Sequence, residues 1–353
     1  MKAMSEYNVA VVGAGAVGQE MLRVLAEHHF PAREVRVLAR SERTMVVDGR
    51  SYAVHATTAE AFAGIDIALF AGTEGEKGAA VTFGPEAVKR GAVVIDNGAD
   101  FRMRPDVPLV VPEVNAAALK RHEGIVANPN CSTAQLVLAL KPLHDAVRVT
   151  RVLVATYQAV SGAGGAAAEE LKDQNVALAE GRAVTQPGPA FPVQIAANVI
   201  PQIGGFDDGG YTSEEMKLVH ETRKIMGDDA IRITPMVTAR VPVFIGHSEA
   251  VYVETERPIT PADARALWHD APGIAVLDEI GGDDPYRAYP TPLFAAGKDT
   301  TYVGRIRQDL GNPNGLNFWV VSDNLRKGAA TNAVQIAESL VEQNLLGKNY
   351  GNF

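Results

Sequence analysis

Hydrophobic residues in the first third of the chain gather in short continuous runs, which are expected strands at 8–13, 34–40, 65–72 and 91–97. Segments with helical spacing of apolar residues, such as 17–28, lie between them. Continuous apolar runs indicate strands covered on both faces, as in a parallel sheet. Their alternation with helices predicts an α/β fold that begins with a Rossmann-type, doubly wound domain.

The middle of the chain has a different pattern, in which charged positions alternate with apolar ones. Longer strands are expected at 149–160, 231–243, 249–256, 300–309 and 315–323. Such alternation predicts a second, α+β domain with a mixed or antiparallel sheet, one face of which packs on helices or on a partner subunit. Stretches rich in glycine and proline, at 181–192 and 281–292, are expected loops.

The last helical pattern, within 326–346, has an apolar stripe on one face. The stripe consists of Ala333, Ile336, Ala337 and Leu340. A chain of 353 residues is too long for one ordinary core, so two domains are expected.

Composition narrows the class of function. The net charge is -9 and no block of basic residues is present, which argues against a nucleic-acid partner but not against a small anionic substrate. No apolar run reaches the roughly 18 residues of a membrane span, so no membrane partner is expected. The single cysteine, Cys131, is typical of a reducing compartment, and we expect a cytoplasmic protein. No metal site is predicted.

A glycine-rich segment at 13–18 fits the Gly-x-Gly-x-x-Gly pattern of dinucleotide sites. Its residues are Gly13, Ala14, Gly15, Ala16, Val17 and Gly18. An expected strand precedes it and an expected helix follows, so the backbone can approach a pyrophosphate at the helix N-terminus. A tight structural turn is the alternative.

The second expected strand ends in LARSER, which indicates which nucleotide binds. Arg40, Ser41 and Arg43 suit the 2′-phosphate of NADP, and no acidic residue stands at the strand tip to bind the ribose hydroxyl of NAD. NADP is therefore favoured, with a solvated charged loop as the alternative.

Cys131 lies at the start of an expected helix that Ser132 or Thr133 can cap. Backbone N–H groups and the helix dipole at such a position stabilise a thiolate. Most cysteines are instead small buried hydrophobes. Spacing alone supports a nucleophile and a core residue about equally.

Other candidates have ordinary alternatives. Arg240 and His247 stand in ARVPVFIGHSEA, and either could be structural. Glu214 and Lys217 lie three apart on one helix face, as common surface ion pairs do. Arg102 follows a strand end, where α/β domains hold ligands. None of these is decisive singly.

Taken together, the chain resembles the aspartate-β-semialdehyde dehydrogenase family. The segments NPNCSTAQLVLALKPLH, TYQAVSGAG, ANVIPQI…YTSEEMK, RVPVFIGHSE and DNLRKGAATNAVQIAE occur in the family's order, and the resemblance runs from about residue 7 to 345. It implies NADPH-dependent reductive dephosphorylation of 4-phospho-L-aspartate, giving L-aspartate 4-semialdehyde and phosphate. The step leads toward lysine or diaminopimelate, threonine, methionine and isoleucine.

The resemblance also implies roles for matching residues. Cys131 would attack the acyl carbon and form a thioester, Gln158 would orient the acyl group, and His247 would be the acid/base partner. Arg240 would hold the substrate α-carboxylate, and Glu214 its ammonium.

Further residues are implied around the phosphate and the cofactor. The phosphate would be surrounded by Arg102, Asn130 and Lys217. The cofactor would lie against Ser161 and Gly162, with Asn324 near its nicotinamide end. We expect residues 1–130 and 325–353 to form an NADP-binding domain and 131–324 a catalytic and dimerisation domain, in a homodimer or a tetramer.

Three segments depart from the family pattern, all in the expected cofactor domain. GAGAVG is one residue shorter than the usual Gly-Ala-Thr-Gly-Ala-Val-Gly, DNGAD replaces Asp-Asn-Ser-Ser, and AGTEGEKGA replaces the Ser-Ala-Gly-Gly loop. Two alternative functions remain. The first is another acyl-phosphate reductase, such as N-acetylglutamyl-phosphate reductase, which would not need Glu214 to bind an ammonium. A non-catalytic NADP-binding regulator would be expected to lack Cys131, His247 or Arg240.

Overall fold

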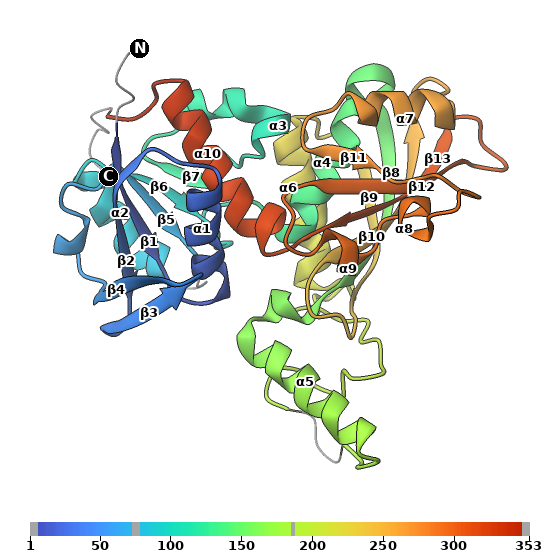
Figure 1. The fold of residues 1–353 in the computed structure, drawn as a ribbon. Helices are drawn as coiled ribbons and strands as arrows, with labels where there is room; N and C mark the ends of the chain where they lie inside the picture. Colours follow the sequence, from blue (N-terminus) through green and yellow to red (C-terminus); the bar gives the residue numbers. More distant parts are fainter. Residues whose placement is uncertain (1–5, 73–77, 185–187, 348–353) are drawn as a thin grey trace. The chain divides into compact units, whose positions relative to one another are not determined.

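The computed structural model describes residues 6–72, 78–184 and 188–347. The chain divides into two compact units (Figure 1). One unit contains the residues up to Asn130 together with those from Ala329 onward, and the other is Cys131–Gly328.

Within the described residues, the first unit contains a seven-stranded sheet of order β3-β4-β2-β1-β5-β6-β7. Its strands are β1 (Tyr7–Val12), β2 (Ala32–Ala39), β3 (Arg43–Val47), β4 (Arg50–Ala56), β5 (Ile67–Phe70), β6 (Val93–Asp96) and β7 (Ile125–Ala127). All neighbours pair in parallel except β3 and β4. The strand order reverses at β1, with β2 on one side and β5 on the other. In such sheets ligands bind at the carboxyl ends of the strands beside this point.

Helices cover both faces of this sheet. They are α1 (Ala16–Glu27), α2 (Ala79–Lys89), α3 (Pro112–Asn115) and α10 (Thr331–Glu342), with 3-10 turns at Glu60–Phe62 and Ala116–Arg121. Helices α1 and α10 share one apolar core with Val9, Val11 and Ile67, and the expected stripe of α10 is buried there. On the other face, Phe83 of α2 packs on Phe62, which stacks on Phe70 of β5. Burial on both faces explains the continuous apolar runs.

The sequence patterns missed the hairpin of β3 and β4, and the short strand β7. The hairpin turns at Asp48 and Gly49, whose φ angles of 48° and 78° are both positive. An Asp-Gly pair between short alternating runs is the expected signal for such a turn. Arg43 therefore begins a strand rather than lying in a charged loop.

The described part of the second unit contains a six-stranded sheet of order β11-β12-β13-β10-β8-β9. Its strands are β8 (Val149–Gln158), β9 (Arg232–Arg240), β10 (His247–Thr255), β11 (Ile274–Val276), β12 (Thr301–Gln308) and β13 (Gly315–Ser322). Two neighbouring pairs, β8 with β9 and β11 with β12, are parallel and the others are antiparallel. The predicted mixed sheet is confirmed.

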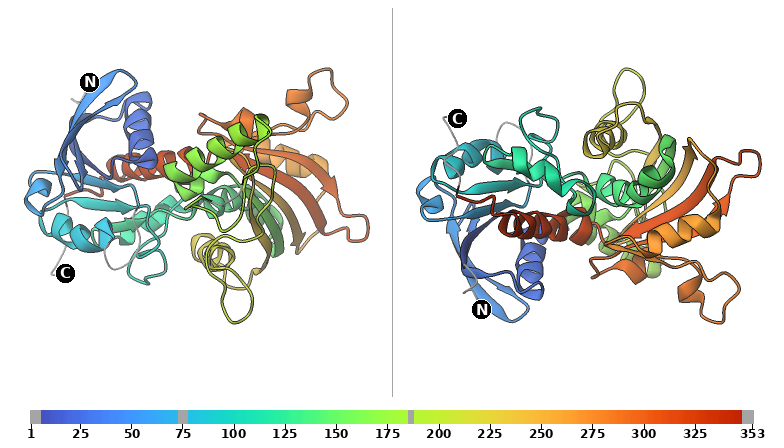
Figure 2. Two further views of the ribbon diagram at one scale, coloured as in Figure 1. Left: turned by 90° about the horizontal axis from the view of Figure 1, so that it is seen from below. Right: turned by 90° about the horizontal axis from the view of Figure 1, so that it is seen from above.

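One face of this sheet is covered by α4 (Cys131–Val147), α6 (Ser213–Met226) and α7 (Pro261–His269) (Figure 2). Their apolar side chains form a core with the sheet that includes Leu140, Val154, Val251 and Trp268. The opposite face carries Tyr157 and Trp319, whose ring centroids lie 5.5 Å apart, and the exposed Met236 of β9.

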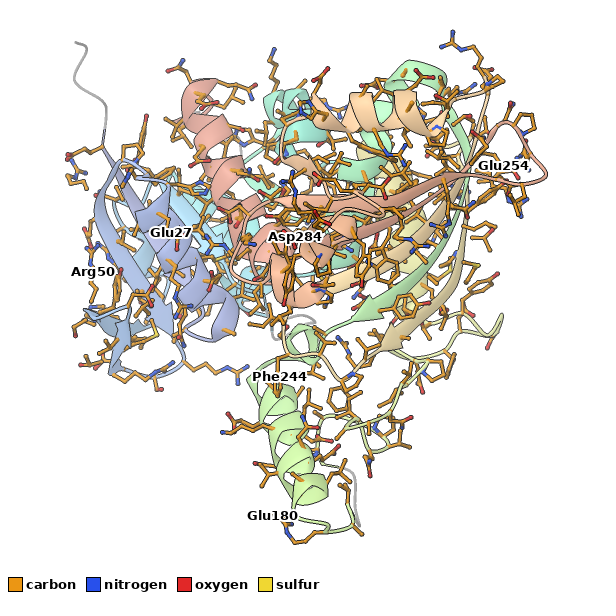
Figure 3. All side chains as sticks on the ribbon, turned by 45° about the vertical axis from the view of Figure 1, so that its right-hand side comes forward. Glu27, Arg50, Glu180, Phe244, Glu254 and Asp284 are labelled. Carbon is orange, nitrogen blue, oxygen red and sulfur yellow. The ribbon has the colours of Figure 1, made fainter. Side chains whose placement is uncertain are left out.

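An excursion follows β8, in which the turn Val160–Ala163 leads into α5 (Gly165–Ala179). Figure 3 shows Phe244 at the end of α5 nearest the sheet and Glu180 at its far end. The buried Glu170 of α5 accepts hydrogen bonds from the backbone N–H groups of Gly188 and Ala190, which fixes the returning chain. The expected loop at 281–292 is partly wrong, because α8 (Pro285–Ala288) and the first residue of α9 (Pro292–Ala295) lie in it.

Candidate active site

Cys131 is the first residue of α4 and is partly exposed. Ser132 and Thr133 lie inside the first turn and are buried, so the expectation that one of them caps the helix is wrong. A Cβ placed on Gly328, in the π-helix Arg326–Ala330, would lie only 2.7 Å from the Cβ of Cys131. The cysteine is therefore held between its own helix turn and the backbone at residue 328.

His247 begins β10 and is fully buried. The backbone N–H of Ala159 donates to its Nδ1 at 3.1 Å, so the neutral ring carries its proton on Nε2. Burial, and then the positive charge of Arg240, hold the pKa of His247 well below its usual value. Nε2 has no hydrogen-bond partner among the described residues. The ring can therefore present a proton to a bound group.

Arg240 ends β9, and its Nη1 donates to the carbonyl oxygen of Ala159 at 2.7 Å. Burial lowers the pKa of Arg240, while the negative charges of Cys131 and Glu214 oppose that shift. A Cβ on Gly162 would lie 2.9 Å from this Nη1 and 3.2 Å from Nε2 of His247. Glycine is needed at 162 because the backbone passes so close to both side chains.

Gln158 ends β8, one residue before Ala159, and lies on the helix-covered face of the sheet. Its Nε2 donates to Oε1 of Glu214 at 3.2 Å and to Oγ1 of Thr156 at 3.3 Å. Glu214 also pairs with Lys217 at 3.3 Å. The alternative of a surface ion pair does not describe this contact, because Glu214 is only 6% exposed.

A capping box fixes the start of α6, which carries this acidic and basic pair. The side chain of Thr212 accepts from the N–H of Glu215, and the Glu215 carboxylate accepts from the N–H of Thr212 at 2.7 Å. The same carboxylate accepts from the N–H of Thr238 at 3.1 Å. Helix α6 is thereby joined to β9 two residues before Arg240.

Asn324 connects two further segments near His247. Its Oδ1 accepts from the N–H of Gly246 at 2.9 Å and lies 3.1 Å from Oγ of Ser161. The second unit thus brings together most of the residues that the sequence singled out. They are Cys131, Gln158, Ser161, Gly162, Glu214, Lys217, Arg240, His247 and Asn324.

In the first unit, the glycine-rich turn joins the carboxyl end of β1 to the start of α1. Gly13 has a φ of 111°, and a Cβ on Gly18 would lie 1.8 Å from the carbonyl oxygen of Gly13. Gly15 is the N-cap, has no side chain to cap the helix, and would leave a Cβ in open space. Uncapped N–H groups beside open space fit the pyrophosphate of a dinucleotide.

Arg40 directly follows β2, and Arg40, Ser41 and Arg43 are all exposed. Nη1 of Arg43 lies 3.4 Å from Oγ of Ser41. Glu42, also exposed, stands between the two arginines. As expected, the residue that directly follows β2 is basic and not acidic, while the exposed carboxylate of Glu42 lies between the two arginines.

Arg102 and Asn130 also belong to the first unit, and both are buried. Arg102 donates from Nε to the carbonyl oxygen of Asn128 at 2.9 Å and from Nη2 to that of Asn97 at 2.7 Å. Among the segments that depart from the family pattern, the N–H of Gly98 donates to the buried carboxylate of Asp96 at 3.0 Å. Most of the AGTEGEKGA segment, at 73–77, lies outside the described residues.

Comparisons with known proteins agree with these two units. A family model described as the semialdehyde dehydrogenase NAD binding domain matches residues 8–122, and the corresponding dimerisation domain matches 140–327. Relatives named aspartate-semialdehyde dehydrogenase are 42% to 50% identical over nearly the whole chain, so the chain belongs to that family. The family prediction, the α/β fold and the oxidoreductase class are thereby confirmed, as is a nicotinamide cofactor in general terms.

Several members of this family are similar to the chain over almost its whole length. The aspartate-semialdehyde dehydrogenase from Aquifex aeolicus is 50% identical, with 96% of this chain and 99% of the relative covered, and that from Bacillus subtilis is 47% identical, with 96% and 99% covered. The crystal structure of aspartate semialdehyde dehydrogenase II from Vibrio cholerae, complexed with ASA, has a TM-score of 0.88 at 46% identity and covers 96% of this chain and 99% of its own. Neither the N-acetylglutamyl-phosphate reductase nor the regulator alternative is favoured.

Three residues of this family member escaped the sequence reasoning. Thr156, which holds Gln158, lies two residues earlier on the same strand face, so strand periodicity could have found it. Gly328 and Gly246 approach Cys131 and Asn324 only in the folded chain, and no local signal marks them.

No cluster of metal-ligating side chains occurs among the residues that the structure describes. None of the described helices is both long enough and apolar enough to cross a membrane.

Proposed function

We propose that the protein uses NADPH to convert 4-phospho-L-aspartate into L-aspartate 4-semialdehyde and phosphate, through a thioester on Cys131. The observation that carries the proposal is the placement of Cys131. It is partly exposed, begins a helix of 17 residues, and lies close enough to Arg240 to influence its ionisation. A helix N-terminus and a guanidinium both stabilise the thiolate form.

The first step is acyl transfer to the cysteine. The Cys131 thiolate attacks the acyl carbon, a C–S bond forms, and the C–O bond to phosphate breaks with its electron pair leaving on phosphate. Arg102, Asn130 and Lys217 would surround that phosphate, in keeping with the resemblance noted from the sequence. Gln158 would orient the acyl oxygen, because Thr156 and Glu214 fix its amide.

The second step reduces the thioester carbon. When bound, NADPH supplies a hydride. His247 holds a proton on Nε2 and would donate a hydrogen bond from it to the oxygen on which negative charge develops. Expulsion of the thiolate then frees the aldehyde and restores Cys131.

The charged groups suit an amino-acid substrate. Arg240 would bind the α-carboxylate through the guanidinium edge that Ala159 leaves open, and Glu214 would bind the ammonium. An N-acetylated substrate has no ammonium, so the buried carboxylate of Glu214 disfavours it.

Cofactor binding is assigned to the first unit, and catalysis and subunit assembly to the second. The first unit would hold NADP, with the pyrophosphate at 13–18 and the 2′-phosphate beside Arg40 and Ser41. The second unit would be catalytic, with Ser161, Gly162 and Asn324 toward the nicotinamide. Its sheet face opposite α4, with Tyr157, Trp319 and the exposed Met236, supports a homodimer or a tetramer, and we place the protein in the cytoplasm.

The decisive experiment measures phosphate-dependent reduction of NADP with aspartate semialdehyde, in parallel with N-acetylglutamate semialdehyde. The wild type should turn over the first substrate and hardly the second. Cys131→Ser should lose nearly all turnover but keep its circular dichroism and NADP binding, since a hydroxyl is a poor nucleophile near neutral pH. A Cys131→Ser variant that retains about a tenth of the wild-type rate would refute the thioester mechanism.

A further inference from the structure

A layer of polar side chains lies between the second sheet and α4, where an apolar core would be expected. Its members come from α4, β8, β10 and β13, and each is at most 2% exposed. They are Gln135, Thr156, Gln158, His247, Glu249 and Ser322. The reaction uses Gln158 and His247 from this layer and leaves Glu249 without a role.

Strand register places Glu249 at the centre of this polar layer. It lies opposite Thr156 on β8, and Thr156 accepts the hydrogen bond that holds Gln158. It lies two residues after His247 on the same face of β10, and His247 itself is opposite Ser322 on β13. One carboxyl group thus lies beside the side chain that holds Gln158 and two residues from His247 on the same strand face.

The carboxyl group of Glu249 faces the amide of Gln135. No hydrogen bond of ordinary length reaches either carboxyl oxygen, or Nε2 of Gln135, from the described residues. An ionised carboxylate in such a place is costly. Burial raises the pKa of Glu249 well above its usual value and thereby favours the neutral acid, which has one O–H to donate.

Gln135 connects this acid to the nucleophile. It lies four residues after Cys131, one turn further along the same side of α4. Its Oε1 accepts a hydrogen bond of 2.6 Å from Oγ of Ser322. The amide is thus fixed on its oxygen side by β13 and faces Glu249 on its nitrogen side.

We propose that Glu249 is a positioning residue, whose carboxyl group anchors the Gln135 amide and thereby sets the position of the first turn of α4, which carries Cys131. The inference rests on the proposed function only in taking Cys131 as the nucleophile. Among the titratable or charged groups on the elements around this layer, those placed in the candidate site are His247 on β10, Arg240 on β9, Glu214 and Lys217 on α6, and Cys131 itself.

The test compares a substitution that keeps the anchor with one that removes it. Glu249→Gln is neutral and keeps a polar side chain facing the Gln135 amide, so it should retain most of the wild-type kcat. Glu249→Leu has similar volume without the polar group, so kcat should fall by about ten- to a hundredfold, the usual cost of a small misplacement. KM for aspartate semialdehyde should change little, because Arg240 and Glu214 remain in place.

A second readout follows Cys131 directly and needs no substrate. Since Cys131 is the only cysteine in the sequence, its alkylation by iodoacetamide reports on this thiol alone. The rate-against-pH profile of Glu249→Leu should shift from that of the wild type, and that of Glu249→Gln should not. Val251→Ala, which opens space in the apolar core two residues further along β10, should lose stability without shifting the profile.

The outcomes separate the inference from the proposed function. Equal kinetics and alkylation profiles for Glu249→Leu and the wild type would overturn the positioning role. A Glu249→Gln variant as impaired as Glu249→Leu would also overturn it, since the neutral amide keeps the anchor. If Cys131→Ser kept its turnover, the thioester mechanism would be refuted. Alkylation of Cys131 in the other variants would still test the positioning role of Glu249.

Discussion

At the scale of single residues, the backbone of Ala159 organises the site. Its N–H donates to Nδ1 of His247 and its carbonyl oxygen accepts from Nη1 of Arg240. A single peptide segment therefore sets the tautomer of the acid and the position of the substrate-binding guanidinium. Both side chains then project toward Gly162, three residues further on.

Gly162→Ala should lower kcat by at least about tenfold, because the added methyl group would displace Arg240 and His247 from reacting positions. Steady-state kinetics measure the effect. The matched control is Gly165→Ala, where a Cβ meets nothing within 4 Å, and it should behave as the wild type. Equal activity of the two variants would mean that the close approach at 162 has no catalytic importance.

Arg240→Lys should raise KM for aspartate semialdehyde and also lower kcat. An ammonium cannot reproduce the forked pairing of a guanidinium with a carboxylate, and it also loses the bond to Ala159. Arg232→Lys, at the exposed far end of the same strand, serves as the control and should change neither constant. An unchanged KM in Arg240→Lys would remove this residue from the substrate site.

At the scale of elements, the connection from β2 to β3 is where nucleotide preference should be decided. Parallel strands β1 and β2 end at the same edge of the sheet, so Arg40 follows β2 beside the turn at 13–18. The hairpin of β3 and β4 then fixes the start of β3, and with it Arg43. The carboxylate of Glu42, between them, would repel a phosphate. The preference for NADP over NAD therefore depends on the attraction that the two arginines supply.

Substitution of Arg40 or Arg43 by alanine should reduce the preference for NADP over NAD. A charge-assisted contact is worth about 1.5–3 kcal/mol, which corresponds to roughly one to two orders of magnitude in kcat/KM. The measurement is kcat/KM for both cofactors in the wild type and in each variant. Arg50→Ala, at the start of β4, is the control. A wild type that prefers NAD, or a preference that survives both substitutions, would contradict the assignment.

At the scale of the whole molecule, two fully buried ionisable groups couple folding to pH in opposite directions. The folded protein keeps His247 as a base of lowered pKa and Glu249 as an acid of raised pKa. His247 therefore costs stability as pH falls below its unfolded pKa of about 6.5. Glu249 contributes stability at low pH and loses that contribution as pH rises above the unfolded carboxyl pKa of about 4.3.

The Glu249→Gln variant isolates the second effect, because His247 acts equally in both proteins. The free energy of unfolding of the variant, relative to the wild type, should increase as pH rises above about 5, with a limiting slope of about 1.4 kcal/mol per pH unit. Urea unfolding at several pH values measures this difference. A difference that does not vary with pH would show that Glu249 is ionised in the folded protein.

Sequence patterns determined the elements and the chemistry of this protein because those signals are local. Continuous and alternating apolar runs report whether a strand is covered on one face or two, and they placed most strands of both sheets. The order of motifs around Cys131, Arg240 and His247 was enough to indicate the family. The missed hairpin turn at Asp48 and Gly49 also had a local signal.

Only the tertiary structure decided which backbone and side-chain groups meet across elements. The closeness of Gly162 to Arg240 and His247, and of Gly328 to Cys131, comes from strands and helices far apart in the sequence. The same is true of the polar layer, since Gln135 and Ser322 are 187 residues apart. Periodicity predicts that a face is buried, but whether a buried glutamate is charged, neutral or anchored depends on neighbours that only the folded chain supplies.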